Sequence, residues 1–377
     1  MKKISFAITL FLFVIATSCK KESETTIKQA ENTQNSIKYA QGLAIYNYEG
    51  YSIVKVNNPW PEANQSFTYV MHKKGITIPD SLKGYTTVQV PLQSVVVTST
   101  THIPSLEMLG VEGTLTGFPN TDYISSEKTR KLIDAGLVKE VGANESLNTE
   151  VIIDLAPDAI IGFSISSNNK SLNNLQQSGL KVLYNGDWTE QTPLGKAEWI
   201  KLFGVLYDRQ QDVNSLFEQI EKDYKEAIEI AKTATAKPTV ISGAIYKDHW
   251  YMPQGGSWAA LFLKDANANY LWKDSEGTGS LSLSFEEVLD KGQNAEYWIV
   301  PFTSLKQMTD ENPHYAEFAA YKNKKVYSFS SKIGATGGAI YYELAPNRPD
   351  LVLKDLIKIL HPGMLSEHEL YFFEELK

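Results

Sequence analysis

Short apolar segments alternate with amphipathic segments along most of the chain. Between residues 40 and 100, stretches rich in Val, Tyr and Thr are separated by Gly, Pro and Asn, a pattern that predicts β-strands. Farther along, helical patterns such as 126–136 alternate with apolar runs such as 158–163. This alternation predicts βαβ units, in which helices cover the faces of a largely parallel sheet.

The strand pattern is interrupted between about residues 193 and 233. One apolar stripe recurs there at intervals of three or four residues, as on an amphipathic helix. Its members are Leu216, Ile220, Tyr224, Ile228 and Ala231. The simplest interpretation is one long helix, and a break near Asp208 is its variant. The alternation of strands and helices resumes after residue 238.

A weak internal repeat relates the two halves. Residues 149–163 and residues 285–302 each contain a glutamate, a short helical pattern and an apolar strand that ends in Phe. The offset is the size of a domain rather than of a solenoid repeat. We therefore expect an α/β fold with two lobes of mainly parallel sheets, joined by a long helix. The expected ranges are 40–190 for the first lobe, 191–236 for the helix and 237–377 for the second lobe.

Composition narrows the function classes. The chain has 377 residues, 42% hydrophobic and 21% charged, which excludes a disordered chain and suggests two domains. Its 36 Lys+Arg against 44 Asp+Glu give a net charge of −8, which argues against nucleic-acid binding. The one cysteine excludes an internal disulfide framework and any Cys-rich metal site.

The N-terminus carries the signals of an exported lipoprotein. Lys2 and Lys3 precede an apolar run over residues 4–16, too short to span a bilayer comfortably. Small residues then lead to Cys19, which resembles a bacterial lipobox, although Ala16 stands where leucine is more usual.

We therefore expect a signal peptide over residues 1–18 and acylation, such as palmitoylation, of Cys19. The polar residues that follow predict a flexible tether over 19–39. The body would then stand in the periplasm or outside the cell, held to the membrane by its lipid. The alternative is an ordinary secretory signal with a chance cysteine.

Motifs of enzymes and metal sites are absent from the sequence. It contains no GxSxG, Walker A, HExxH or GxGxxG motif. The glycines of 334–339 are more typical of a plain loop than of a phosphate cradle. The six histidines show no ligand spacing, so neither a metal site nor a cofactor is expected.

Aromatic and polar residues follow several of the expected strands. Ligands of open α/β sheets lie beyond the carboxyl ends of the strands, so these residues are expected to line a cleft between the lobes. They are Ser99, Thr100, Thr101, His102, Phe118 and Phe163 in the first lobe, and Trp250, Tyr251, Gln254, Gly255, Gly256 and Trp258 in the second. Each aromatic taken singly is more often a buried core ring or an isolated surface ring, but the combination of rings with Gly-Gly and Pro over 250–258 favours a site. Arg348 is a candidate partner for an anionic ligand; the alternative is a salt bridge near a helix start.

The stretch from Val95 to Leu183 resembles the periplasmic substrate-binding proteins of iron–siderophore, haem and cobalamin ABC importers. The matching features are THIPSLEMLGV, GFP-N, VGANESLNTEVIIDLAPDAIIG and LQQSGLKVLY, followed in the second half by GGSWAALFLKDANANYLW, SLSFEEVL and NRPDLVLKDLIKILHP. The resemblance extends over roughly residues 90–363, and residues 40–90 fit less clearly. It implies a class III bilobal fold with little hinge motion.

The resemblance also implies a monomer that delivers a metal chelate or macrocycle to an ABC permease and ATPase. Docking on the permease would use one exposed glutamate from each lobe, Glu150 and Glu286, which also fit as ordinary helix-start residues. A tethered enzyme of related architecture and a capture lipoprotein without an importer remain as alternatives.

Overall fold

The computed structural model describes residues 34–377. The expected signal peptide, Cys19 and most of the expected tether lie outside the described residues. Within residues 34–377, no helix combines the length and the apolar character that a membrane span needs.

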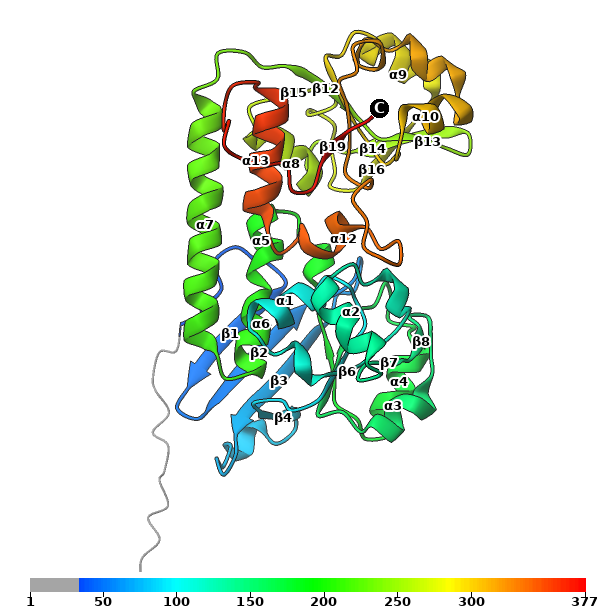
Figure 1. The fold of residues 1–377 in the computed structure, drawn as a ribbon. Helices are drawn as coiled ribbons and strands as arrows, with labels where there is room; N and C mark the ends of the chain where they lie inside the picture. Colours follow the sequence, from blue (N-terminus) through cyan, green and yellow to red (C-terminus); the bar gives the residue numbers. More distant parts are fainter. Residues whose placement is uncertain (1–33) are drawn as a thin grey trace, which may run out of the picture. The chain divides into compact units, whose positions relative to one another are not determined.

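The first lobe contains a four-stranded, a five-stranded and a two-stranded sheet, the last formed by β8 and β9, with helices around them (Figure 1). Its strands are β1 (Leu43–Tyr48), β2 (Tyr51–Asn57), β3 (Ser66–Lys73), β4 (Thr86–Val90), β5 (Val95–Val97), β6 (Leu115–Phe118), β7 (Lys139–Glu140), β8 (Gly142–Ala143), β9 (Ser146–Leu147), β10 (Ala159–Gly162) and β11 (Val182–Tyr184). Its helices are α1 (His102–Met108), α2 (Glu127–Asp134), α3 (Thr149–Leu155) and α4 (Lys170–Gln177), with 3-10 turns η1 (Asp80–Leu82), η2 (Glu112–Thr114), η3 (Thr121–Tyr123) and η4 (Asp187–Thr189).

Three helices connect the lobes, and the second lobe follows them. The connecting helices are α5 (Pro193–Glu198), α6 (Ile200–Leu206) and α7 (Gln210–Lys232). The strands of the second lobe are β12 (Thr239–Ser242), β13 (Ala244–Tyr246), β14 (His249–Pro253), β15 (Asn269–Tyr270), β16 (Ser280–Leu283), β17 (Tyr297–Val300), β18 (Val326–Ser328) and β19 (Glu374–Glu375). Its helices are α8 (Trp258–Asp265), α9 (Phe285–Gly292), α10 (Leu305–Glu311), α11 (Ala319–Lys322), α12 (Ile340–Leu344) and α13 (Pro349–Leu360), with the 3-10 turn η5 (Pro313–Glu317).

Each lobe is built on a five-stranded sheet. The order in the first lobe is β11-β10-β5-β6-β7, with all strands parallel. The order in the second is β15-β12-β17-β18-β19, in which only β19 is antiparallel. The first lobe adds the N-terminal sheet β1-β2-β3-β4, and the second adds the hairpin sheet β13-β14-β16. The expectation of an α/β fold with mainly parallel sheets is confirmed.

Continuous apolar sequence explains the central strands. Every residue of β5, β10, β11 and β17 is buried, as strands covered by helices on both faces require. The internal repeat corresponds to equivalent structure, because α3 leads into β10 and α9 leads into β17, and both strands lie inside their sheets.

The long inter-lobe helix is α7. The expectation of one continuous helix over 193–233 is therefore wrong. Helices α5 and α6 run up to a turn at residues 207–209, where Asp208 has a left-handed φ of 54°. The chain then reverses into the 23 residues of α7, which packs on α6. Gly204 permits that approach, since a Cβ there would lie 2.4 Å from Cγ1 of Val213. The break expected near Asp208 is therefore confirmed.

Helix α7 belongs to the cores of both lobes. Val213 and Phe217, near its start, pack in the core of the first lobe. Tyr224, Ala227 and Ala231, near its end, pack in the core of the second. Of the expected stripe, Ile220, Tyr224 and Ala231 are buried, and Leu216 and Ile228 are half-buried.

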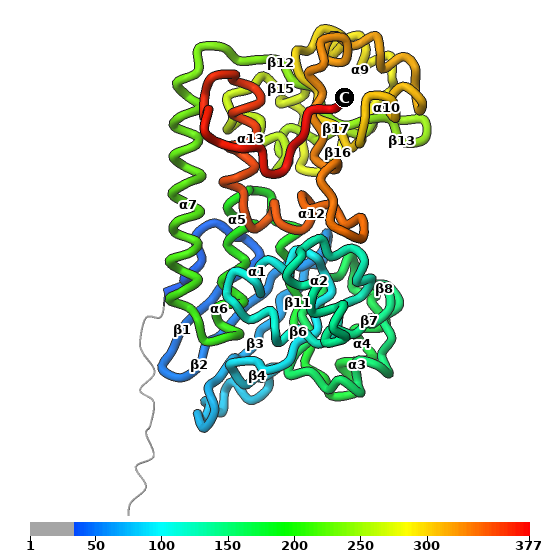
Figure 2. The backbone as a smooth tube through the Cα atoms, viewed as in Figure 1, coloured from blue at the N-terminus to red at the C-terminus, as the bar shows by residue number. Residues whose placement is uncertain are grey.

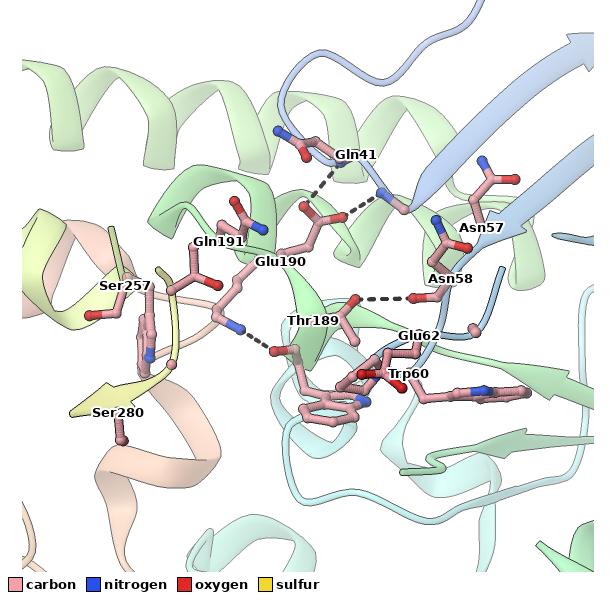
Figure 3. Close-up of a pocket in the computed structure, with 18 of the residues that line it drawn as sticks. Gln41, Asn57, Asn58, Trp60, Glu62, Thr189, Glu190, Gln191, Ser257 and Ser280 are labelled. Carbon is pink, nitrogen blue, oxygen red and sulfur yellow. Dashed lines mark hydrogen bonds between the residues drawn. The ribbon is translucent and has the colours of Figure 1, made fainter. Parts of the chain in front are cut away.

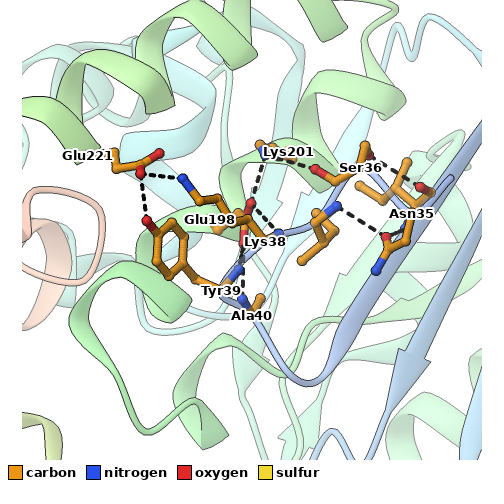
Figure 4. Close-up of polar contacts among 10 residues, drawn as sticks. Asn35, Ser36, Lys38, Tyr39, Ala40, Glu198, Lys201 and Glu221 are labelled. Atoms are coloured by element: carbon orange, nitrogen blue, oxygen red, sulfur yellow. Dashed lines mark hydrogen bonds and ion pairs between the residues drawn. The ribbon is translucent and has the colours of Figure 1, made fainter.

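Two buried carboxylates hold the N-terminal segment against the rest of the first lobe, and Figure 4 shows the contacts of the first, Glu198. Glu198 accepts hydrogen bonds from the backbone N–H groups of Lys38, Tyr39 and Ala40, and from Nζ of Lys201. Glu190 accepts the next two N–H groups, those of residues 41 and 42. The boundary expected at residues 39 and 40 therefore lies inside a segment that is bonded to the body.

A second connection between the lobes is made by residues 334–347, here called the crossing segment, which includes α12 (Figure 2). Asn347 accepts a hydrogen bond from Ser105 and donates one to the carbonyl of Thr101. Gly338 lies so close to the first lobe that a Cβ would be 2.2 Å from the carbonyl oxygen of Tyr123. The glycines of 334–339 thus have a packing role, as expected for a loop.

Candidate ligand-binding cleft

A cavity of about 400 Å³ lies at the carboxyl ends of the first-lobe strands, and we call it the strand-end cavity. Ser99 and Thr100 follow β5, while Phe118 ends β6 and Phe163 follows β10. Because these strands are parallel, their carboxyl ends meet at one edge of the sheet. The crossing segment of the second lobe closes the cavity through Gly337, Gly338, Ala339 and Tyr342.

A second cavity, of about 620 Å³, is lined by the second lobe, and we call it the aromatic cavity. Tyr342 lines both this cavity and the strand-end cavity, so the two adjoin. Its rings come from the β13-β14 hairpin, α8, α12 and residues next to β17, β18 and β19. They are Tyr246, Tyr251, Trp258, Phe262, Phe302, Phe329, Tyr341, Tyr342 and Phe373. Several lie edge to face or tilted at 5.2–6.3 Å between centroids, an arrangement that presents ring faces for stacking.

The third cavity, of about 680 Å³, has one wall from each lobe, and we call it the polar cavity (Figure 3). The first-lobe wall includes Asn57, Asn58, Trp60 and Trp188, and the facing wall includes Trp258. Pro253, Trp258, Ala259 and Ser280 line this cavity as well as the aromatic cavity. The three cavities therefore adjoin through shared lining residues, and the strand-end and polar cavities have walls from both lobes. We call the three together the cleft.

Charged groups of the polar cavity are already engaged with the protein. Nζ of Lys196 donates to the carbonyls of Asp187 and Trp188 at 3.1 and 2.8 Å, and lies 5.3 Å from the ring centroid of Trp258. Burial lowers the pKa of Lys196, and the nearby carboxylates of Asp187 and Glu190 oppose that shift. Glu190 also accepts the indole N–H of Trp199 at 3.0 Å. These contacts fix the floor of the cavity.

Six of the thirteen residues expected to bind ligand line the cavities. They are Ser99, Thr100, Phe118, Phe163, Tyr251 and Trp258. Tyr251 is 41% exposed, and Trp258 is half-buried at the start of α8. Ser99, Thr100, Phe118 and Phe163 end or follow parallel strands, as the sequence led us to expect, whereas Tyr251 lies within β14. Ligand contact by these residues stays a prediction.

Two expected residues lie in the core instead, so the expectation for them is wrong. The ring of Trp250 is fully buried and stacks on Trp298 at 5.2 Å, while its indole N–H donates to the carbonyl of Ser242. His102 is fully buried beside Phe203, and that burial lowers its pKa to about 4. Neither side chain reaches a cavity surface.

Five others do not line the cavities. Thr101 donates to Asp187 and ties the β5 loop to η4. Gln254 accepts the N–H of Gly279 and holds the loop that precedes β16. Gly255 and Gly256 allow close approach of the same loop, since a Cβ would lie 2.1 Å from the carbonyl oxygen of residue 273 and 2.8 Å from that of residue 277, respectively. Arg348 is paired with Asp350 at 2.7 Å, which is the alternative that the sequence left open.

The N-terminal sheet also lines the polar cavity, which was not expected from the sequence. Asn57, Asn58, Trp60 and Glu62 stand at the end of β2 and in the loop before β3. A usable signal was the run Asn-Asn-Pro-Trp after an apolar strand, which predicts a polar turn that carries a large ring. Tyr341 and Tyr342 were missed because the sequence alone does not show that the crossing segment returns to the first lobe.

The expected docking residues begin two helices that the internal repeat relates. Glu150 lies in the first turn of α3 and Glu286 in the first turn of α9, and both are exposed. None of the hydrogen bonds and ion pairs among residues 34–377 involves either carboxylate. By contrast, the neighbouring Glu287 completes a capping box with Ser284.

In the described part of the chain, no group of three or more His, Cys, Asp or Glu side chains could hold a metal ion. The arrangement offers stacking rings, amides and hydroxyls. It is therefore suited to hold a ligand by contact and hydrogen bonds.

A family model described as periplasmic binding protein matches residues 95–333. An uncharacterized lipoprotein of Methanocaldococcus jannaschii is 26% identical over 409 aligned positions, which cover 99% of this chain and 96% of the relative. Among solved structures, a possible iron-binding periplasmic solute-binding protein of Staphylococcus epidermidis has a TM-score of 0.57 at 19% identity, covering 72% of this chain and 100% of that one. The vitamin B12-binding protein BtuF of Vibrio cholerae has a TM-score of 0.53 at 14% identity, covering 72% and 97%.

Proposed function

The chain belongs to the periplasmic binding protein family, and from that premise we propose that it is the lipid-anchored substrate-binding protein of an ABC importer. In this role it captures an iron–siderophore, haem or cobalamin-like chelate in the cleft and delivers it to a permease. The matched family and the similar solved structures are binding proteins, which favours capture over catalysis.

The observation that carries the proposal is the set of three adjoining cavities that make up the cleft. Three adjoining cavities of about 400, 620 and 680 Å³ accommodate a ligand larger than an ion or an amino acid. Their aromatic walls suit the flat faces of a macrocycle or an aryl chelator.

Anchoring is supported by the sequence that precedes the body and by the relative named as a lipoprotein. The tether expected over 19–39 would let the body move from capture to docking while it remains near the membrane. Docking through Glu150 and Glu286 is supported by their exposure and by their equivalent positions in the repeat.

The proposal is tested by ligand identification and titration together. Native mass spectrometry of protein purified from its source is expected to show a bound chelate, and quenching of tryptophan fluorescence then measures its affinity. Trp188 and Trp258 line the cleft, so ligand binding is expected to quench them. Turnover of the bound compound would instead support a tethered enzyme. Binding without neighbouring permease and ATPase genes would support a capture lipoprotein.

A further inference from the structure

The N-terminal sheet supplies one wall of the polar cavity. Asn57, Asn58 and Trp60 line it from the end of β2 and the loop that follows. These residues precede the segment 95–333 that the family model matches. The wall is therefore a feature of this chain beyond the matched part of the family.

That wall is held in one position by contacts beneath it. The indole N–H of Trp188 donates to the carbonyl of Pro59 at 3.1 Å. The ring of Trp60 is 4% exposed and lies edge-on to Tyr184 at 5.1 Å. Gly186 lets the loop approach, because a Cβ there would lie 2.9 Å from Cα of Pro59. A wall that is already ordered loses little conformational entropy when a ligand binds.

The wall presents hydrogen-bonding groups that the protein does not use. Within residues 34–377, no hydrogen bond involves the side-chain amides of Asn57 or Asn58, or the hydroxyls of Thr278 and Ser280 opposite them. Each amide offers two donors and an acceptor, and each hydroxyl offers one donor and acceptor lone pairs. The polar cavity can therefore satisfy several donors and acceptors of a ligand from both sides (Figure 3).

The charges that line the cleft are mainly negative. The described lining residues carry the carboxylates Glu62, Glu190 and Glu311 and the ammonium of Lys196. Lys196 donates to two carbonyls beneath it, and the backbone N–H groups of residues 41 and 42 are bound to Glu190. A ligand with several negative charges would meet carboxylates and lose hydration, which is unfavourable in a partly buried site.

We propose that the polar cavity is a subsite for an uncharged, hydrogen-bonding arm of the ligand, and that the ligand as a whole is neutral or cationic. This inference rests on the proposed function, because it assumes that the cleft captures a chelate. The aromatic and strand-end cavities hold the body of the chelate, and the amides of Asn57 and Asn58 bind its arm.

The charge of the ligand is tested with four probes. Cyanocobalamin is uncharged, ferrioxamine B is cationic, haemin is negatively charged through its two propionates, and ferric enterobactin carries three negative charges. At least one of the first two is expected to bind about tenfold or more tightly than ferric enterobactin, given the scale of like-charge penalties. Tightest binding of haemin or ferric enterobactin would overturn the subsite while leaving chelate capture intact. If none of the four bound, the proposed function would fail, and the subsite with it.

The arm is tested by removing the amides. Asn58 has a left-handed φ of 47°, so Asn57→Ala/Asn58→Gly deletes both amides without forcing Ala into that conformation. Gln211→Ala, which removes an exposed amide at the start of α7, is the matched control. The double variant is expected to bind the tightest neutral or cationic probe about tenfold more weakly, the scale of two net hydrogen bonds.

No loss of affinity for the tightest neutral or cationic probe would overturn the subsite, and so would an equal loss in the Gln211→Ala control. Thermal unfolding of the variant checks that a loss of affinity does not reflect a loss of folding.

Discussion

Glu343 of the second lobe accepts a hydrogen bond from the backbone N–H of Ser125 in the first lobe, at 2.7 Å. Its other oxygen accepts the N–H of Ser126, the N-cap residue of α2, at 3.1 Å. The Glu343 side chain is buried, and this burial raises its pKa from 4.5 to about 7, with a smaller contribution from the charge of Glu107. The two N–H groups oppose the shift, but desolvation prevails. A titratable group thus lies at the contact between the lobes.

The stability of the protein is expected to depend on this group. Between pH 4.5 and about 7, the folded protein retains a proton on Glu343 that the unfolded chain releases. The contribution of Glu343 to the free energy of unfolding therefore falls as the pH rises through this window. Chemical denaturation at several pH values measures the slope.

Glu343→Gln removes the titratable carboxyl group and is expected to flatten the dependence of the free energy of unfolding on pH. It is also expected to lower stability at acidic pH, because an amide cannot accept both N–H groups. Glu226→Gln, an exposed change on α7, serves as the control and should leave the slope unchanged. A slope that Glu343→Gln does not alter would assign the pH dependence to other groups.

The lobes are expected to close little when ligand binds. Helix α7 packs in both cores, and the crossing segment joins the lobes a second time. Small-angle scattering with and without ligand should give nearly the same radius of gyration, and a contraction of several ångströms would contradict this. Gly338→Ala, whose Cβ would meet the carbonyl of Tyr123 at 2.2 Å, is expected to separate the lobes and change the scattering curve.

Two tryptophans near in sequence are expected to respond differently to truncation. Trp258→Ala should weaken ligand binding by about 1–3 kcal/mol with little change in stability, because this ring lines two cavities. Trp250→Ala should lower the free energy of unfolding by about 3–5 kcal/mol, the usual scale for a large ring in a core. Titration and denaturation of both variants separate the roles. If Trp250→Ala lowered ligand affinity without lowering stability, Trp250 would have to be assigned to the binding site.

The same pair shows how far sequence reasoning reaches. Apolar runs such as those of β10 and β17 predict the parallel sheets, because a strand that is covered on both faces must be apolar at every position. Strand ends predict the edge that carries Phe118 and Phe163. Which face of β14 turns inward depends on pairing with β13 and β16, and the sequence does not reveal that register. Trp250 and Tyr251 therefore could not be distinguished, nor could the wall at Asn57 be placed opposite Trp258.

Acylation of Cys19 is expected to hold the protein on the membrane. The charged start, the apolar run over 4–16 and the small residues before Cys19 motivate this prediction. The Cys19→Ser protein should be lost from the membrane fraction, or its signal peptide should remain uncleaved, because the lipid could no longer be attached. Fractionation and the mass of the mature N-terminus test it. Normal processing with full membrane retention would show that something other than this cysteine anchors the chain.

The surfaces around Glu150 and Glu286 are expected to act after capture. Both carboxylates are exposed and are absent from the lining of the cleft, so Glu150→Lys/Glu286→Lys should leave ligand affinity unchanged. Against cations on a permease, each reversal replaces attraction with repulsion, at a cost of several kcal/mol. Uptake by the intact transporter should therefore be lost.

Raised salt should restore part of that uptake, because it screens exposed charges. Glu218→Lys/Glu226→Lys on α7 makes the same change in net charge away from α3 and α9, and is expected to transport normally (Figure 1). Transport and binding are measured side by side on both double variants. Normal transport by Glu150→Lys/Glu286→Lys would remove the docking assignment, and equal losses in both variants would attribute the effect to net charge. For a carrier, we expect only Glu150→Lys/Glu286→Lys to lose transport, with its ligand affinity intact. An enzyme would not show this pattern, because it has no second protein to which α3 and α9 must deliver a ligand.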